Sequence, residues 1–224
     1  MLGLLYDIHG NIPALERVIA EADDEGIDRW LLGGDYGTPS PWPLETLDRL
    51  KQLPNATWIR GNGERWLREP PLDRPEVMES YAIFRGHLPD EVVDALYALP
   101  PQAEVDGVLY VHGSPLSDVE SFAPQPKPDE ERLLAGVRDR QIVFGHSHQQ
   151  FRRPGPAGTE LLNPGSVGMP LDGDTRAAWA VRYSDGQFEF RRTAYDNQRA
   201  ADAYRKLGGE FGEFAARRIE RGSD

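Results

Sequence analysis

The sequence predicts an α/β fold, and two observations support this prediction. Short apolar runs that end in polar residues recur along the chain, and each has the length of a buried strand rather than of a helix. Between them lie segments whose apolar residues recur at helical spacing. Such alternation is typical of layered α/β architectures, in which ligands bind outside the carboxyl ends of the strands. The expected buried strands are residues 2–7, 30–35, 56–62, 108–112 and 141–148.

Helices are expected between these strands. The first covers residues 13–22, because Pro13 suits an early helical position and the apolar residues that follow lie on one face. Leucines in residues 44–53 form a second amphipathic stripe. Residues 63–104 are expected to be a helical insertion, with its clearest helix after Pro89. This insertion either packs against the edge of the sheet or forms a wall or lid over the substrate.

The C-terminal third is expected to be mostly β structure followed by helix. Two alternating runs are joined at Ser184-Asp185-Gly186, which indicates a hairpin. Without an internal repeat or a linker in the sequence, residues 1–224 are expected to form a single domain. The expected elements here are strands at 159–162, 177–183 and 187–193 and a helical segment at 197–221 that is interrupted at Gly208-Gly209.

Composition excludes several classes of function. The chain has no cysteine, which rules out disulfides, thiolate ligands and a cysteine nucleophile. Its 25 Lys and Arg against 37 Asp and Glu give a net charge of −12, which argues against general nucleic-acid binding. No apolar run approaches the length of a membrane span, and no basic segment precedes the first run as in a signal peptide. A cytoplasmic protein without membrane association is expected.

Four of the five histidines stand at the ends of expected strands. Lone histidines at strand ends are usually structural, but four of them joined by two aspartates and an asparagine predict a site for two metal ions. Mixed imidazole and carboxylate ligands favour Mn, Fe, Co, Ni or Zn over Ca or Mg alone. On an extended chain, ligands two residues apart leave the same face. The candidate metal ligands are Asp7, His9, Asp35, Asn62, His112, His146 and His148.

These residues lie in an ordered set of motifs that resembles the signature of calcineurin-like metallophosphoesterases. The resemblance runs from residue 7 to about residue 168, and its last segment, Asn163-Pro164-Gly165-Ser166-Val167-Gly168, is similar to the small bacterial and archaeal phosphodiesterase branch. The motifs are Asp7-Ile8-His9-Gly10-Asn11, Gly34-Asp35, Gly61-Asn62, His112-Gly113 and Gly145-His146-Ser147-His148.

The resemblance implies a four-layer α/β/β/α sandwich of two mixed sheets flanked by helices. It also implies two divalent ions, with manganese the first expectation, and a metal-bound hydroxide that attacks the phosphate ester. Asp35 would bridge the ions and, with Asn62 and His112, act in catalysis. The implied ligand sets are Asp7, His9 and His148 for one ion and Asn62, His112 and His146 for the other.

Four further residues leave alternatives open. Asn11 is expected either to contact the substrate phosphate or to cap a helix, and Arg60 either to contact the phosphate or to pair with Glu64. Many members of the family have a histidine where this chain has Gly63, which predicts weak catalysis with poor leaving groups. His87 either replaces that histidine or has only a structural role.

The expected function is therefore metal-dependent hydrolysis of a phosphate ester, with a phosphodiester as the first expectation and a phosphomonoester as the alternative. A protein phosphatase and a dinucleoside polyphosphate hydrolase share the same ligands and remain alternatives. A non-catalytic scaffold and a metal or nucleotide sensor are further alternatives from other classes. The expected partner is a small-molecule or nucleotide phosphoester, and the oligomeric state stays open.

Overall fold

Two five-stranded mixed sheets form the centre of the computed structural model, which describes the backbone of residues 1–224 and all side chains except those of Pro75, Glu76, Glu79 and Ile83. The first sheet has the order β10-β9-β1-β2-β3, with β1, β2 and β3 parallel and the other two pairings antiparallel. Its strands are β1 (Leu2–Leu5), β2 (Trp30–Leu32), β3 (Ala56–Trp58), β9 (Ala177–Arg182) and β10 (Phe188–Thr193).

The second sheet has the order β4-β5-β6-β8-β7. Its three inner strands are parallel, and each edge strand pairs antiparallel with its neighbour. The strands are β4 (Gln102–Val105), β5 (Val108–Val111), β6 (Gln141–Val143), β7 (Gln150–Pro154) and β8 (Glu160–Pro164).

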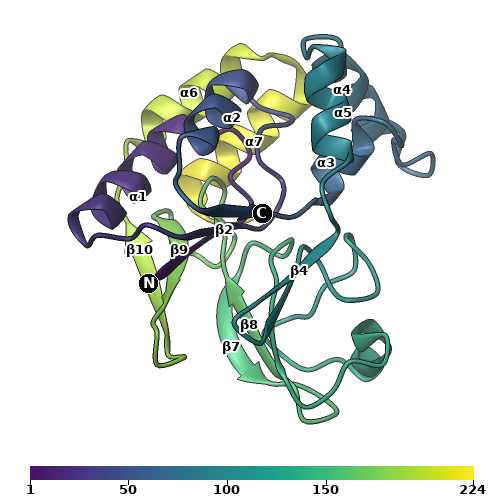
Figure 1. Cartoon of the computed structure of the whole chain (residues 1–224). Coiled ribbons are helices and arrows are strands. Elements are labelled where there is room, and N and C mark those ends of the chain that lie inside the picture. The colour runs from purple at the N-terminus through teal and green to yellow at the C-terminus, as the bar shows by residue number, and fades with distance from the viewer.

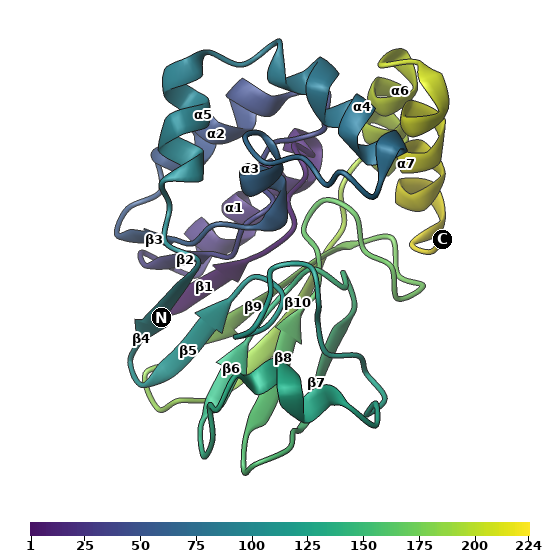
Figure 2. The ribbon, with the colours of Figure 1, turned by 90° about the vertical axis from the view of Figure 1, so that its right-hand side faces the viewer.

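Most helices cover the outer face of the first sheet and the rim beside it (Figure 1). Viewed from the side, the insertion helices α3 to α5 and the C-terminal pair α6 and α7 stand on this side of the two sheets (Figure 2). The helices are α1 (Ile12–Asp24), α2 (Pro43–Lys51), α3 (Asn62–Trp66), α4 (Pro75–Arg85), α5 (Asp90–Tyr97), α6 (Asn197–Lys206), α7 (Gly209–Arg221) and a 3₁₀ turn, η1 (Glu130–Leu134).

The packing of the apolar side chains confirms the four-layer sandwich. On β1, Leu2 and Leu4 face the second sheet and pack with residues such as Tyr110, whereas Leu5 faces the helices. Burial of these faces against one another removes apolar area from water and holds the layers together. The outer face of the second sheet is covered by η1 and by loops that place Phe122 against it, so this fourth layer is thin.

The strands end earlier than the sequence patterns predict. β1 ends at Leu5 and β6 at Val143, and the chain then turns, so the polar residues lie on loops beyond the strands. Asn62 follows β3 as the first residue of α3. The helical part of the insertion ends at Tyr97, because the residues that follow pair with β5 as strand β4.

The break between the last two helices is confirmed at Gly208 and Gly209, whose φ angles of 76° and 66° lie in the left-handed region that favours glycine. Among the described residues, no helix is long and apolar enough to cross a membrane. The helices α6 and α7 pack against each other and bury Met169, which belongs to a loop after β8.

Candidate metal centre

The structure brings the predicted metal ligands together at the ends of β1, β2, β5 and β6. The ligand atoms form two groups, and within each group they lie within 4.8 Å of one another. Asn62 joins the second group, with its Oδ1 3.0 Å from Nε2 of His112. The first group consists of Asp7, His9 and His148, and the second of Asp35, His112 and His146.

Five of these residues have left-handed backbone conformations. Their φ angles are positive, whereas the sequence analysis expected extended segments that place both ligands on one face. That expectation was wrong, because each strand ends before its ligands. Left-handed residues other than glycine cost roughly 1–2 kcal/mol each, and such conformations cluster at functional sites. The angles are 51° for Asp7, 48° for His9, 55° for Asp35, 64° for His146 and 56° for His148.

Hydrogen bonds to backbone groups fix the positions of these turns relative to one another. The N–H of Asp7 donates to the carbonyl of Gly34 at 3.2 Å, and the N–H of His9 donates to the carbonyl of Asp35 at 2.9 Å. The loops after β1 and β2 therefore fix each other, although they belong to different ligand groups. The N–H of His146 donates to Oδ2 of Asp7 at 2.9 Å, which ties the second sheet to the first.

Two carboxylates face both groups. Oδ2 of Asp35 lies 3.8 Å from Nε2 of His9, and its Oδ1 lies 3.5 Å from Nε2 of His112. Oδ1 of Asp7 lies 3.4 Å from Nε2 of His148 and 3.9 Å from Nε2 of His112. This Asp7 oxygen is buried and lacks a hydrogen-bond partner among the described residues. A buried carboxylate oxygen without a donor is costly unless a cation meets it.

The carbonyl partners of two histidines orient their rings. Nδ1 of His148 lies 2.7 Å from the carbonyl of Met169, and Nδ1 of His112 lies 2.9 Å from the carbonyl of Gly33. A carbonyl only accepts hydrogen bonds, so Nδ1 carries the hydrogen in both rings. The lone pair of the neutral ring is then on Nε2, which points into the cluster, as in metal-bound histidines.

The amide of Asn62 also suits a cation. Its oxygen faces Nε2 of His112, and rotation of the amide would instead place Nδ2 2.8 Å from Nδ1 of His146. When His112 is neutral, its Nε2 lone pair repels this oxygen, whereas a proton or a metal ion at Nε2 removes the repulsion. The nitrogen and oxygen donors, the unpaired Asp7 oxygen and this amide therefore fit divalent transition metals.

Burial and mutual repulsion perturb the ionisation of the cluster. Burial, with the charge of His148, lowers the pKa of His9 to about 3, and burial with His112 lowers that of His146 to about 4. Burial raises the pKa of Asp35, and the carboxylates of Asp35 and Asp7 outweigh burial to raise that of His112. Two imidazoles are thus neutral at pH 7 and ready to bind metal.

Glu64 supports the second group, a role that was not predicted from the sequence. It was considered only as a partner of Arg60, but its buried carboxylate accepts from the N–H groups of Asp35, Tyr36 and Gly61 at 2.9, 2.9 and 2.8 Å. The side chain therefore fixes the turn that carries Asp35. A glutamate three residues after Gly61, at the start of a short helix, is the sequence signal for this role.

Asn11 and Arg60, the residues predicted to contact the substrate phosphate, both have partners within the protein. Asn11 is buried and caps α1: its Oδ1 accepts from the N–H of Ala14, and its Nδ2 donates to the carbonyl of Gly168 and to Tyr195. Both amide hydrogens are thus in use. The guanidinium of Arg60 donates to the carbonyl of Tyr97 at 2.7 Å and lies 4.9 Å from the centre of that ring.

Gly63 stands where many family members have a histidine, and His87 was considered as its replacement. The two positions have different surroundings. Gly63 lies in α3, and its N–H donates to Oδ1 of Asp35 at 2.7 Å. A Cβ at this position would lie 2.8 Å from the same oxygen and 3.2 Å from the hydroxyl of Tyr81. His87 is exposed and follows α4.

Three further supports come from residues whose sequence context gave little signal. The hydroxyl of Ser166 donates to the carbonyl of Asp7 at 2.6 Å, and that of Tyr204 donates to the carbonyl of His9. Arg65 forms a two-point ion pair with Asp118 at 2.6 and 2.7 Å, which joins α3 to the loop after His112.

A family model, one relative and several solved structures are similar to this chain. A family model described as the calcineurin-like phosphoesterase superfamily domain matches residues 1–186. The uncharacterized protein MJ0912 of Methanocaldococcus jannaschii is 26% identical over 223 residues, which cover 89% of this chain and 90% of that protein. Among solved structures, a metallophosphoesterase from Sphaerobacter thermophilus has 24% identity and a TM-score of 0.79 over 99% of each chain. Hypothetical protein PH1004 from Pyrococcus horikoshii has 20% identity and a TM-score of 0.83 over the whole of both chains.

Proposed function

This chain belongs to the calcineurin-like phosphoesterase superfamily, and from that premise we propose that it hydrolyses phosphodiesters at a centre of two divalent metal ions. The observation that carries the proposal is the pair of ligand groups, each with its donor atoms within 4.8 Å of one another, together with a carboxylate that faces both. A single tetrahedral ion needs four ligands, whereas seven donors suit two ions.

One ion would be held by Asp7, His9 and His148. The other would be held by Asn62, His112 and His146, with Asp35 between the two sites. Manganese is the first candidate, and iron, zinc, cobalt and nickel suit the same nitrogen and oxygen donors.

Divalent ions, when bound, supply Lewis-acid chemistry: they activate water and neutralise charge on the phosphate oxygens. The protein supplies the positions. The carbonyls of Met169 and Gly33 aim two imidazoles, and Glu64 fixes the turn of Asp35. Asp35, Asn62 and His112 are the proposed catalytic residues, because they would hold the ions that bind and orient the reacting phosphate.

The test is metal reconstitution followed by a substrate panel. Protein purified without metal and loaded with manganese should bind about two ions per chain and hydrolyse bis(p-nitrophenyl) phosphate faster than p-nitrophenyl phosphate. The panel should include nucleotides and phosphopeptides, because these represent the alternative substrates of the superfamily. Protein that binds two ions but hydrolyses none of these esters would be a non-catalytic module, and the proposal would be wrong.

A further inference from the structure

The main-chain carbonyl oxygen of Asp118 lies among the donor atoms of the second ligand group. Oδ1 of Asn62 is 3.0 Å from Nε2 of His112. The amide atom at this place is also 2.8 Å from Nδ1 of His146 and 3.2 Å from the carbonyl oxygen of Asp118. Ligands that share one ion through bonds of about 2.1 Å, at right or tetrahedral angles, lie about 3.0–3.4 Å apart. The separations from Asn62 are therefore close to those between ligands of a single ion.

No donor among the described residues forms a hydrogen bond to this carbonyl, which lies in a loop outside the helices and strands. Rotation of the Asn62 amide would let its Nδ2 donate to the carbonyl, but Oδ1 would then turn to the N–H of Gly63 at 3.2 Å. An amide binds a metal ion through its oxygen. Asn62 is therefore a ligand only in the orientation that leaves two acceptor oxygens facing each other, and a cation that contacts both removes this repulsion.

Two features of the chain hold this carbonyl beside the second group. A Cβ at Gly113 would lie 3.0 Å from the carbonyl oxygen and 2.9 Å from the carbonyl carbon of Asp118, so a glycine next to His112 allows the close approach. The carboxylate of Asp118 accepts from Nε and Nη2 of Arg65 at 2.6 and 2.7 Å. Arg65 belongs to α3, the helix that begins with Asn62. This two-point ion pair therefore fixes the carbonyl and the Asn62 amide relative to each other.

We propose that the main-chain carbonyl oxygen of Asp118 is an additional ligand of the ion held by Asn62, His112 and His146, and that Arg65 is the residue that positions it. The inference rests on the proposed function, because it completes the ligand set of the same centre. With Asp35 between the two sites, this ion would have more protein donors than a tetrahedral ion takes. Carbonyl oxygens suit manganese better than they suit zinc, so the added ligand favours manganese at this site.

Manganese titration of the metal-free full chain, with free manganese measured by electron paramagnetic resonance, tests the role of Arg65. Arg65→Ala should weaken the binding of one of the two ions by about ten-fold or more and leave the other unchanged, since loss of a group that orients a ligand typically costs about 10–100-fold in affinity. Removal of a positive charge would by itself strengthen the binding of a cation, so the charge effect has the opposite sign. Arg65→Lys, which keeps the charge and a single hydrogen bond, should recover part of the affinity.

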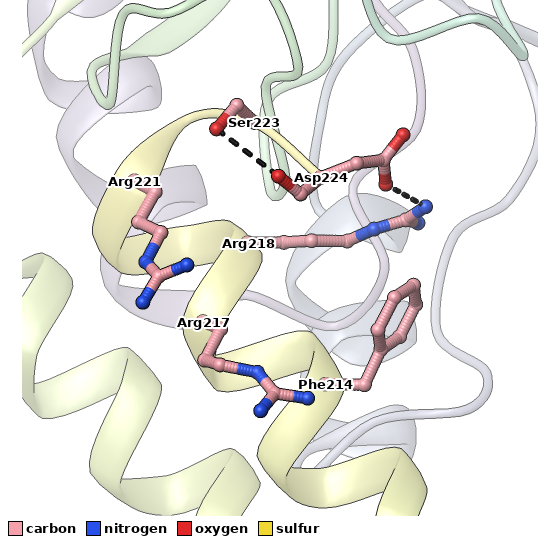
Figure 3. Close-up of a pocket in the computed structure, with 6 residues that line it drawn as sticks. All are labelled: Phe214, Arg217, Arg218, Arg221, Ser223 and Asp224. Atoms are coloured by element: carbon pink, nitrogen blue, oxygen red, sulfur yellow. Dashed lines mark hydrogen bonds and ion pairs between the residues drawn. The ribbon is translucent and has the colours of Figure 1, made fainter.

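Two other arginines provide matched controls. Arg217 extends from α7 without an ion pair to the other residues drawn in Figure 3, so Arg217→Ala removes the same charge alone. Arg153→Ala removes a comparable two-point ion pair, in which Arg153 of β7 donates to Glu130 of η1 at 2.9 and 2.6 Å. Neither variant should lose affinity for either ion. Circular dichroism of each metal-free variant separates a loss of fold from a loss of metal affinity.

A crystal structure of the manganese-loaded chain measures the proposed ligand directly. The carbonyl oxygen of Asp118 should lie about 2.2 Å from the ion, and a separation above about 3 Å would overturn the proposal. A folded Arg65→Ala variant with wild-type affinity for both ions would overturn it as well. The proposed function fails by a different result: a chain that binds two ions but hydrolyses no ester is not a phosphoesterase, whereas the distance from the carbonyl to the ion still decides whether Asp118 is a ligand.

Discussion

Asp35 has its two oxygens facing His9 and His112, and we propose that both halves of the metal centre depend on it. We expect Asp35→Ala to reduce the manganese content from about two ions per chain to one or fewer. The variant should lose about 10³-fold or more in kcat, since each ion contributes several kcal/mol to stabilisation of the transition state. Elemental analysis and steady-state kinetics measure both effects, with circular dichroism to confirm the fold.

Asp23→Asn is a suitable control for this experiment, because Asp23 is an exposed carboxylate on α1. It should retain both ions and full activity. A wild type with one ion per chain, or an Asp35→Ala variant with normal activity, would contradict the binuclear centre.

Gly63 is a second residue whose surroundings limit what can replace it. Since a Cβ would lie 2.8 Å from Oδ1 of Asp35, we expect Gly63→Ala to displace that carboxylate and lower kcat/KM by about ten-fold or more. Gly63→His should lower it further for aryl and alkyl diesters alike. A well-folded, metal-loaded Gly63→His that selectively accelerates alkyl esters would show that the imidazole finds room and acts as an acid.

In the wild type, no histidine at position 63 is present to protonate the leaving group. General acid catalysis contributes about 10²- to 10⁴-fold, and it matters most for alkoxide leaving groups. Aryl diesters should therefore react much faster than alkyl diesters, and the rate should depend steeply on the pKa of the leaving group. A shallow dependence in a series of substituted phenyl and alkyl diesters would point to another acid.

The sequence singles out the candidate metal ligands because their residue types and order are distinctive, but it does not show their backbone conformations or the side chains that support them. The left-handed turns of Asp7 and His9 follow from loops that lock together only in the folded protein. The role of Asn11 could not be settled from sequence, because a cap and a phosphate ligand require the same side chain. The structure adds that Asn11 is buried and that its side chain caps α1.

At the level of elements, predictions succeeded where one face of the element is apolar. The helix α1 and the hairpin of β9 and β10 have such faces, and the structure confirms them. The edge strands β4 and β7 were not predicted, because their residues are polar or partly exposed and only pairing with β5 and β8 defines them. Pairing at a sheet edge depends on the tertiary fold more than on local propensity.

The helix α6, which packs against α7, supports the first ligand group through a contact with the backbone of His9. Tyr204 of α6 is buried and donates its hydroxyl hydrogen to the carbonyl of His9. We expect Tyr204→Phe to lower the free energy of unfolding by about 1–3 kcal/mol, because the buried carbonyl loses its donor. Manganese affinity should also fall, since the left-handed turn at His9 loses a restraint.

Chemical denaturation of metal-free protein and metal titration measure these two effects. Tyr183→Phe removes a tyrosine hydroxyl from the hairpin strand end, far along the chain from His9, and serves as the control. If both variants bind manganese as tightly as the wild type, then α6 contributes stability without positioning His9.

At the scale of the whole molecule, each ligand group draws on both sheets. Asp7, His9 and Asp35 follow strands of the first sheet, and His112, His146 and His148 follow strands of the second. The centre therefore exists only when the two sheets are packed together. Metal that binds the folded chain should stabilise it by about 2.7 kcal/mol per ion at a free concentration 100-fold above Kd.

For a chain of this size, that stabilisation corresponds to an increase in melting temperature of roughly 5–10 °C per ion. Calorimetry with manganese and with excess chelator measures the difference. An unchanged melting temperature in a protein that binds two ions would mean that the ions do not connect the sheets.

The pH dependence of the metal-free protein follows from its histidines. The pKa values of His9 and His146, at about 3 and 4, lie below the ordinary value of 6.5, so the unfolded chain binds more protons than the folded chain between these values. Stability should therefore fall as pH decreases from about 6.5 toward 4. The raised pKa of His112 acts in the opposite sense: its contribution is present below about 6.5 and is lost as pH rises through the folded value.

Metal binding is also linked to the protonation of the ligands. His9 and His146 are already neutral at pH 7, whereas the buried pair of His112 and Asp35 retains a proton that a metal ion must displace. We expect addition of manganese at pH 7 to release protons into weakly buffered solution.

The acid limb of the activity profile should also move to lower pH as the manganese concentration is raised, because protons and metal compete for the same ligands. Potentiometric titration and pH–rate profiles at several metal concentrations test this expectation. An acid limb that saturating metal leaves in place would instead report titration of the substrate or of a group outside the centre.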